Sequence, residues 1–487
     1  DWPMVAKIRE EGLQRSRLAE TLSYMTDVLG ARLTLSDGMT RAQAWAMSEM
    51  EGMGLTNVGL EPFMDYGVSW DNEYVSLHLL EPDYQPMVGY PLTHTPGTDG
   101  RKTLDVVIAD VQTIQDLDRY RGRLAGVAVL STPPAEIDMA RIREGVPQRT
   151  AEELRALEEE VLPAAPRGSP TPRNPDLLRA EDRLEFYRTE GVAVVLECSS
   201  GWIGAVRGFA RPGTRADRWG REESLAGPPI VAVTPEHYNR MYRVLEREIP
   251  VTVEVDVRNR IGEERGEASN VLGEIVGSDL ADEVVMMGAH FDTWHASPNA
   301  SDNTSGVAVV LEAARILKAL GVTPRRTIRV ALWAGEEQGL HGSREYVLKH
   351  FGNPNEPGIG AKPDYEKFSV YFNQDYGPGL YRGVWLQGNE HVRKTFEAWM
   401  EPFHDFGMTT LSPRSVGSTD HIPFDNVGLP GFQFLQDRAG GTGGHTNLDF
   451  FDTLPLDDLT KNAVIMASFV YHAAMSEDRI PRKNRGR

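Results

Sequence analysis

The chain has 487 residues, of which 40% are apolar and 25% are charged, and its formal net charge is −20. This length exceeds one compact core, so we expect two domains, or one domain with a large insertion. The acidic excess argues against nucleic acid as a partner, because nucleic-acid binding rests on a cationic surface. No apolar run approaches the roughly 18 residues that a membrane span needs, so we expect no membrane span.

The single cysteine, Cys198, excludes an intramolecular disulfide. It ends an apolar run, which predicts a small core residue and not a reactive thiol. The chain begins at Asp1, without Met and without a signal peptide. A trimmed chain would look the same, but we expect a secreted or periplasmic protein whose signal peptide has been removed.

Residues 1–60 have helical periodicity, with one helix expected from residue 4 to Gly30 and a second over 40–54. From about Trp70 the pattern changes to short alternating strands. A Pro- and Arg-rich stretch at 159–176 predicts a surface loop or a partly disordered excursion. We therefore predict an N-terminal helical part of the main domain (1–70), an inserted β-rich domain (71–240) and the main domain itself (241–487).

In the main domain, apolar strand-like runs alternate with amphipathic helices. Strands are expected at 251–257, 282–290, 326–335, 368–375 and 429–437, and helices at 306–321 and around 459–471. Such alternation is typical of an α/β fold with a mainly parallel, mixed sheet sandwiched by helices. In these sheets functional groups gather in the loops at the carboxyl ends of the strands.

Each of four expected strand ends carries side chains that bind hard metal ions. The first leads to His290, Asp292 and Asp302, the second to Glu336 and Glu337, the third to Asp375, and the fourth, through a Gly-rich segment, to His445. Alone, a His at a strand end or a Glu pair is more often a surface feature, but four successive ends favour a metal site. His and carboxylate ligands without thiolate suit zinc or a similar divalent ion. With five ligands one carboxylate would have to bridge, as in two-metal hydrolases.

The segments "VVMMGAHFDTWH", "SDNTSG", "ALWAGEEQGLHGS" and "STDHIPFDNVGLPGFQF" resemble, in this order, the motifs of the co-catalytic zinc peptidase family. That family includes bacterial aminopeptidases and the glutamate carboxypeptidases, and the chain is most similar to its carboxypeptidase Q subfamily. The resemblance covers most of the chain. It implies the zinc exopeptidase fold, a protease-associated type for the inserted domain, and a homodimer.

The resemblance also implies a role for each candidate residue. It makes Asp302 the bridge between two zinc ions, with His290 and Asp375 on one ion and Glu337 and His445 on the other. Glu336 would be the general base, and the carboxylate of Asp292 would accept a hydrogen bond from the far nitrogen of His290. We expect two Zn²⁺ per chain.

The chain departs from the family pattern at the oxyanion donor. Several members have a Tyr where this chain has Val416, and a Ser where it has Thr419. The donor must then be a backbone N–H, the metal or Tyr376. We take Tyr376, Thr419 and His421 as candidate substrate-binding residues.

The expected function is that of a dinuclear zinc exopeptidase that hydrolyses the terminal amide bonds of dipeptides or short peptides. The alternatives are a non-peptide amidase or deacylase on the same metals, and a non-catalytic ectodomain of this fold. The sequence leaves open whether the enzyme is an aminopeptidase, a dipeptidase or a carboxypeptidase. Its later loops contain both cations and anions, namely Arg382, Arg414, Arg438, Asp405, Asp420, Asp425 and Asp437.

Overall fold

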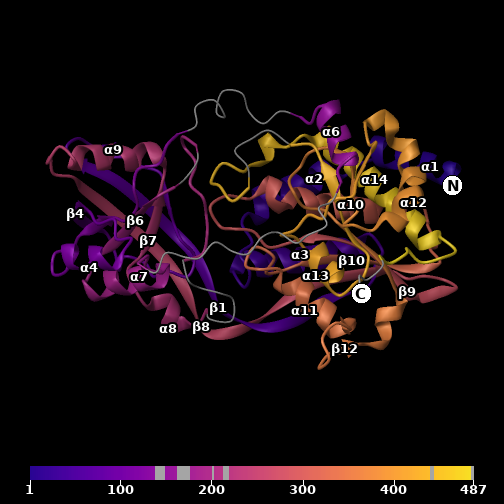
Figure 1. Ribbon diagram of the computed structural model, residues 1–487, viewed down its shortest axis with the longest axis horizontal. Helices are drawn as coiled ribbons and strands as arrows, with labels where there is room; N and C mark the ends of the chain where they lie inside the picture. The colour runs from indigo at the N-terminus through magenta and orange to yellow at the C-terminus, as the bar shows by residue number, and fades with distance from the viewer. Residues whose placement is uncertain (138–147, 162–175, 200–201, 212–218, 439–443, 484–487) are drawn as a thin grey trace.

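A computed structural model describes residues 1–137, 148–161, 176–199, 202–211, 219–438 and 444–483. It has two lobes joined by two very long antiparallel strands, β1 (Thr56–Glu81) and β8 (Thr252–Ile275) (Figure 1). The chain between these strands, residues 82–251, builds what we call the insert lobe, apart from a segment around residues 151–158 that packs on the main lobe (Figure 1). The remainder is the main lobe, and both termini lie there (Figure 1). Most of the loop expected at 159–176 lies outside the described residues.

The N-terminal region is helical, as predicted, but its first helix is interrupted. It consists of α1 (Trp2–Gln14), α2 (Leu18–Ser23) and a π-helical turn, η1 (Tyr24–Leu29). The turn stops at Gly30, whose φ of 71° suits a residue without a side chain. Helix α3 (Asp37–Gly52) starts where the Ser36 side chain accepts a hydrogen bond from the Met39 N–H at 3.1 Å.

The main lobe has the predicted mainly parallel, mixed sheet. Its strand order is β15-β14-β16-β13-β9-β10-β8, and β10, β9, β13 and β16 are parallel. The strands are β9 (Leu280–His290), β10 (Arg326–Trp333), β13 (Phe368–Asn373), β14 (Tyr381–Trp385), β15 (Thr410–Ser412) and β16 (Gly431–Gln436). Because the four central strands run the same way, their carboxyl ends meet at one edge of the sheet.

Helices cover both faces of this sheet. The larger are α10 (Ser305–Ala319), α11 (His341–His350), α12 (Arg393–Met400), α13 (His421–Asn426) and α14 (Leu456–Met475). Shorter elements connect them: η3 (Ala300–Thr304), β11 (Gly352–Asn353), β12 (Gly360–Ala361), η4 (Pro363–Lys367), η5 (Glu390–Val392), η6 (Glu401–Phe406) and η7 (Phe451–Thr453).

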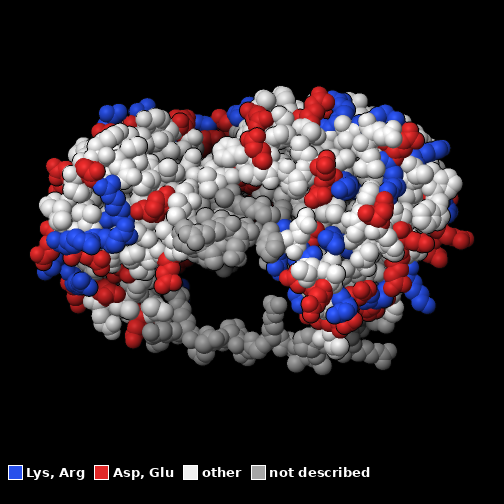
Figure 2. Space-filling view, turned by 90° about the horizontal axis from the view of Figure 1, so that it is seen from above, with Lys and Arg blue, Asp and Glu red and all other residues white. Residues whose placement is uncertain are grey.

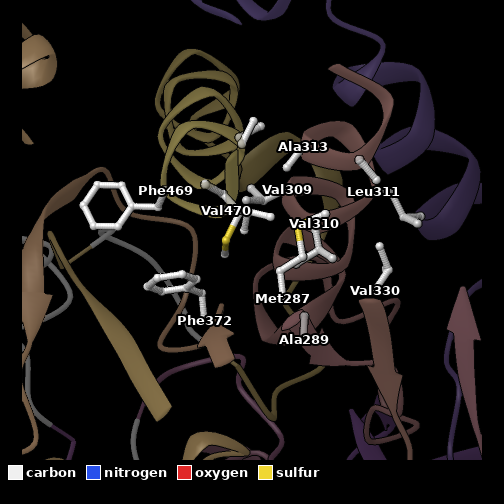
Figure 3. Packing of buried hydrophobic residues seen from close by; sticks show 14 of the residues in the cluster. Met287, Ala289, Val309, Val310, Leu311, Ala313, Val330, Phe372, Phe469 and Val470 are labelled. Atoms are coloured by element: carbon white, nitrogen blue, oxygen red, sulfur yellow. The ribbon is translucent and has the colours of Figure 1, made fainter. Parts of the chain in front are cut away.

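Successive side chains of β9 point to opposite faces of the sheet and pack in different apolar clusters. Met287 and Ala289 pack with α10 and α14 in the largest core cluster, where Phe469 of α14 and Phe372 of β13 meet at 5.8 Å (Figure 3). Met286 faces the other way, into a cluster covered by α11 and α13. Burying each Met or Phe side chain of these clusters stabilises the fold by about 1.5–3 kcal/mol. The sheet is therefore held rigidly from both sides.

The insert lobe continues the sheet beyond β8, in the order β4-β5-β6-β7-β3, and adds helices of its own. Its strands are β2 (Gln85–Pro86), β3 (Gly89–Pro91), β4 (Lys102–Ile108), β5 (Ala128–Leu130), β6 (Val194–Cys198) and β7 (Ile230–Val233). Its helices are α4 (Ile114–Tyr120), α7 (Ala180–Thr189), α8 (Arg221–Leu225) and α9 (Pro235–Leu245). Helix α6 (Ala151–Glu158) comes from the same stretch of the chain but packs on the main lobe (Figure 1). Apolar clusters lie on both faces of β5 and β6, one of them including side chains of α9 and the other those of α7. Its assignment to the protease-associated type stays a prediction.

The long strands β1 and β8 were not anticipated. The sequence predicted only short strands from about Trp70 and one strand at 251–257, whereas β1 has 26 residues and β8 has 24. Their pairing contains six register shifts, and the side chains at these irregularities break the apolar–polar alternation by which a strand is recognised. The predicted domain boundaries at 70/71 and 240/241 stay predictions.

The surface has mixed charge. On the face shown in Figure 2, acidic and basic side chains are interspersed over both lobes. Among the described residues, no helix combines the length and the apolar character needed to cross a bilayer. Export and homodimer formation stay predictions.

Candidate metal centre

His290 is the last residue of β9 and is buried at the carboxyl edge of the sheet. Its Nδ1 lies 2.9 Å from the backbone carbonyl oxygen of Asp292 and 4.0 Å from the carboxylate of that residue. The carboxylate instead accepts hydrogen bonds from the backbone N–H groups of Glu336 at 3.1 Å and Glu337 at 3.3 Å. The expected carboxylate–imidazole bond is thus replaced by a carbonyl contact, because the turn after β9 brings the carbonyl closer. Asp292 holds the Glu loop in place.

Asp302 lies between two imidazoles. It belongs to η3, directly before α10, and its Oδ1 is 3.1 Å from Nε2 of His290 while its Oδ2 is 3.0 Å from Nε2 of His445. Burial raises the pKa of the Asp302 carboxyl, but the hydrogen bonds from the two His outweigh it and hold that pKa well below its usual range. A carboxylate with one oxygen toward each imidazole is oriented to bridge two cations.

The Glu pair follows β10, on a loop beside β9. Glu337 Oε2 lies 2.8 Å from Nε2 of His445, and Glu336 Oε2 lies 3.9 Å from Nε2 of His290. Burial raises the pKa of Glu337 to about 7 and that of Glu336 well above its usual value. Glu337 Oε1 is buried and has no hydrogen-bond partner in the described part of the chain. A cation at this position would stabilise both carboxylates in their charged form.

Asp375 and His445 complete the arrangement. Asp375 follows β13, and its Oδ1 is 3.8 Å from Nε2 of His290. His445 lies beyond β16 and approaches the other oxygen of Asp302. The residue before it, Gly444, is so close to Asp302 that an added Cβ would lie 2.3 Å from Oδ2. Only glycine therefore fits at this position.

Two groups of ligand atoms result, and they share Asp302. His290, Asp302 and Asp375 form one group, and Asp302, Glu337 and His445 form the other; within each, the ligand atoms lie within 4.8 Å of one another. The donors are imidazole nitrogens and carboxylate oxygens without sulfur, which fits zinc or another first-row divalent ion. The structure thus brings together all five residues predicted as ligands, with Glu336 beside them.

The three candidate substrate-binding residues have different positions. Tyr376 follows Asp375, is 41% exposed, and its hydroxyl donates to the carbonyl oxygen of Gly417. Thr419 is buried and accepts a hydrogen bond from the Asn373 side chain at 2.7 Å. His421 is also buried, and burial lowers its pKa to about 4, so the imidazole is neutral. Of the three, only Tyr376 offers a surface to a ligand.

Some residues beside the centre had not been singled out as part of it. The Asp449 carboxylate accepts from the Ser301 N–H at 2.9 Å and the Asp302 N–H at 3.3 Å, and thereby fixes η3. From the insert lobe, the Gly208 N–H donates to the His445 carbonyl oxygen at 2.8 Å. Asp449 follows closely after His445 and could have been noticed. Nothing in the sequence signals that residue 208 lies beside residue 445.

The described geometry can now be compared with known proteins. Residues 270–470, which include the whole candidate centre, match the sequence profile of peptidase family M28. These residues form a peptidase M28 domain. The protein is a metallopeptidase, and the predicted resemblance is confirmed.

Relatives of this metallopeptidase match it over different shares of its length. Carboxypeptidase Q of Bos taurus is 24% identical over 97% of this chain and 88% of its own length. Aminopeptidase YwaD of Bacillus subtilis is 28% identical over 40% of this chain and 42% of its own length. A peptidase M28 precursor from Shewanella amazonensis has a similar structure, with a TM-score of 0.71, 21% identity and 99% of both chains covered. The two-lobed architecture is thus found in a solved structure.

Proposed function

We propose that this metallopeptidase is a two-metal exopeptidase that uses zinc to hydrolyse the terminal amide bond of dipeptides or short peptides. The observation that carries the proposal is the position of Asp302, whose two oxygens face the two imidazoles of His290 and His445 at 3.1 and 3.0 Å. The choice of zinc is supported by the nitrogen and oxygen ligand set. It is also supported by the similar fold of a Bacillus subtilis protein described as a zinc aminopeptidase, with a TM-score of 0.60 at 18% identity.

His290 and Asp375 would hold one ion, Glu337 and His445 the other, and Asp302 both. When bound, the ions would supply Lewis acidity and lower the pKa of water so that it attacks at neutral pH. The backbone N–H bonds to Asp292 keep Glu336 and Glu337 on one rigid loop. Glu337 can therefore ligate while Glu336 remains beside the centre, 3.9 Å from His290.

Glu336 is the proposed general base. Its carboxylate would take a proton from the attacking water as the new C–O bond forms at the scissile carbonyl. The C–N bond then breaks, and the same proton passes to the leaving nitrogen, so that the peptide ends as a carboxylic acid and an amine. A positioned carboxylate of this kind contributes about 10²- to 10⁴-fold to the rate.

One dipeptide in three forms tests the proposal: free, N-acetylated and C-amidated, each with zinc and after chelation. Chelator-sensitive cleavage of any form supports a metal-dependent exopeptidase. Cleavage of the amidated but not the acetylated form means an aminopeptidase, and cleavage of the free form alone means a dipeptidase. Cleavage of the acetylated but not the amidated form means a carboxypeptidase. If zinc-loaded protein cleaves none of them, the non-peptide amidase and the non-catalytic ectodomain take its place.

A further inference from the structure

Most of the charged side chains expected around the site form an ion pair with a side chain of opposite charge. The ion pairs are Arg382 with Asp437 at 2.9 Å, Arg414 with Glu160 at 2.7 Å, Arg438 with Glu153 at 3.7 Å, Asp405 with Arg9 at 2.5 Å and Asp425 with Lys483 at 2.5 Å. The remaining one, Asp420, is fully buried and accepts a hydrogen bond from Ser343. None of these groups is therefore a free charge for a substrate terminus.

The insert lobe places a different cation beside the centre. Its segment 204–209 runs along residues 445–447 and forms a β-bridge between Arg207 and Thr446. Two further hydrogen bonds join the segments: the Val206 N–H donates to the Asn447 side chain at 2.6 Å, and the Asn447 N–H donates to the Val206 carbonyl at 3.0 Å. Because these contacts use the backbone of the insert segment, the Arg207 side chain is not needed to hold it there.

The Arg207 side chain lies against an aromatic ring that in turn contacts a proposed metal ligand. Its guanidinium carbon is 5.3 Å from the ring centre of Phe209, and that ring is 5.3 Å from the imidazole of His445 at an angle of 83°. Since both distances are 5.3 Å, the guanidinium carbon lies no more than 10.6 Å from the centre of the imidazole ring. Arg207 is exposed and makes no ion pair with any carboxylate in the described residues. It is a cation held by an aromatic ring and open to a ligand.

We propose that Arg207 binds the free C-terminal carboxylate of the peptide substrate, an inference that rests on the proposed exopeptidase function. A guanidinium presents paired N–H donors that match a carboxylate. Each residue beyond the scissile bond extends a peptide by at most about 3.6 Å, so a carboxylate one or two residues away is within reach. The substrate class is therefore short peptides with an unmodified C-terminus, and the insert lobe contributes to their selection.

The test compares kcat/KM for a free dipeptide with that for its C-terminal amide, in zinc-loaded protein. The wild-type protein should prefer the free form. Arg207→Gln should lower kcat/KM for the free form roughly 10- to 100-fold, the range for a hydrogen bond to a charged group, and change the amide little. For Arg207→Lys, kcat/KM for the free form should lie between the values for the wild-type protein and for Arg207→Gln. Arg414→Gln, which removes an arginine that is paired with Glu160, is the matched control. It should keep the wild-type ratio of kcat/KM for the free and amidated forms.

An unchanged ratio of free to amidated substrate in Arg207→Gln would overturn the inference while leaving the exopeptidase intact. Complete inactivity of the wild-type protein on peptides would overturn the proposed function instead. The inference is then decided by calorimetric binding of leucine and leucinamide to the zinc-loaded protein. A preference for leucine that disappears in Arg207→Gln retains the carboxylate site, and equal binding by both proteins overturns it.

Discussion

Both lobes contain parallel strands of one continuous sheet, but different residue types follow these strands in the two lobes. In the main lobe, the parallel strands β9, β10 and β13 lead into His290, the Glu336–Glu337 pair and Asp375. In the insert lobe, the parallel strands β5, β6 and β7 lead into Ser131, Ser199 and Thr234. In the part of the chain that the structure describes, both groups of metal-type ligands lie in the main lobe. The carboxyl ends of parallel strands bring side chains together in both lobes. Only side chains that can bind metal ions form a metal site there.

The insert lobe contributes at its border with the main lobe. From the same stretch of the chain, helix α6 packs on the main lobe, with Leu154 in one apolar cluster with Trp385 and Leu435 (Figure 1). The segment 204–209 contacts the residues around His445. The main lobe thus holds the proposed chemistry, and the insert lobe shapes its surroundings. Four substitutions test this division of roles between the lobes. They are given from the largest expected effect to the smallest.

Asp302→Asn tests the main lobe at its centre. The amide lacks the negative charge that would be shared by both cations, so metal content should fall below two ions per chain. Losing several kcal/mol of charge stabilisation corresponds to roughly 10³-fold or more in rate. Elemental analysis and dipeptide hydrolysis measure the two effects. Full metal content with near-normal turnover would remove Asp302 from the bridging position.

Glu336→Gln separates the base from the ligands. Since Glu336 is not in either ligand group, both metals should remain, while kcat falls at least about 10²-fold. The measurement pairs metal analysis with single-turnover hydrolysis. Near-normal turnover would assign the proton transfer to another group.

Gly444→Ala tests the close approach at Asp302. The added Cβ would meet Oδ2 at 2.3 Å, so the carboxylate or the His445 loop must shift. We expect zinc affinity to fall about 10- to 100-fold, the scale for disturbing the support of a ligand. Competition with a chelating dye measures the affinity. Wild-type affinity would mean that the loop before His445 adapts without moving its imidazole.

Cys198→Ala tests the insert lobe, where no catalytic chemistry is expected. Burial raises the pKa of the Cys198 thiol to about 11, so at pH 8 the native thiol is almost entirely protonated. The substitution should leave hydrolysis within about twofold. In the native wild-type protein, alkylation should be slow at pH 8, accelerate as the pH approaches 11, and be fast after unfolding. Rapid alkylation of native protein at pH 8 with loss of activity would contradict this.

The sequence predicted those parts of the site whose residues directly follow a recognisable strand. His290, Glu337 and Asp375 follow directly after apolar strands, and a parallel sheet brings such positions together. The pattern did not predict β1 and β8 at full length, because their bulges disturb the alternation. Spacing also cannot reveal the contact between Gly208 and His445, which joins residues far apart in the chain.

The contact between His290 and Asp292 shows a finer limit. The sequence indicated that the two residues act together, but not whether carboxylate or carbonyl faces the imidazole. The backbone turn after β9 decides this, placing the carbonyl at 2.9 Å and the carboxylate at 4.0 Å. The ion pairs of Arg382, Arg414 and Arg438 show the same limit. The sequence contains the charged residues, but tertiary packing decides which of them pair.

The central claim, that two ions bridged by Asp302 perform the hydrolysis, is tested most directly by titrating metal-free protein with zinc. Bound zinc and dipeptide hydrolysis are followed in the same samples. The account predicts two ions per chain, with full activity reached only when both are bound, and no such two-ion binding in Asp302→Asn. Full activity at one ion per chain, or hydrolysis that persists after chelation, would contradict it.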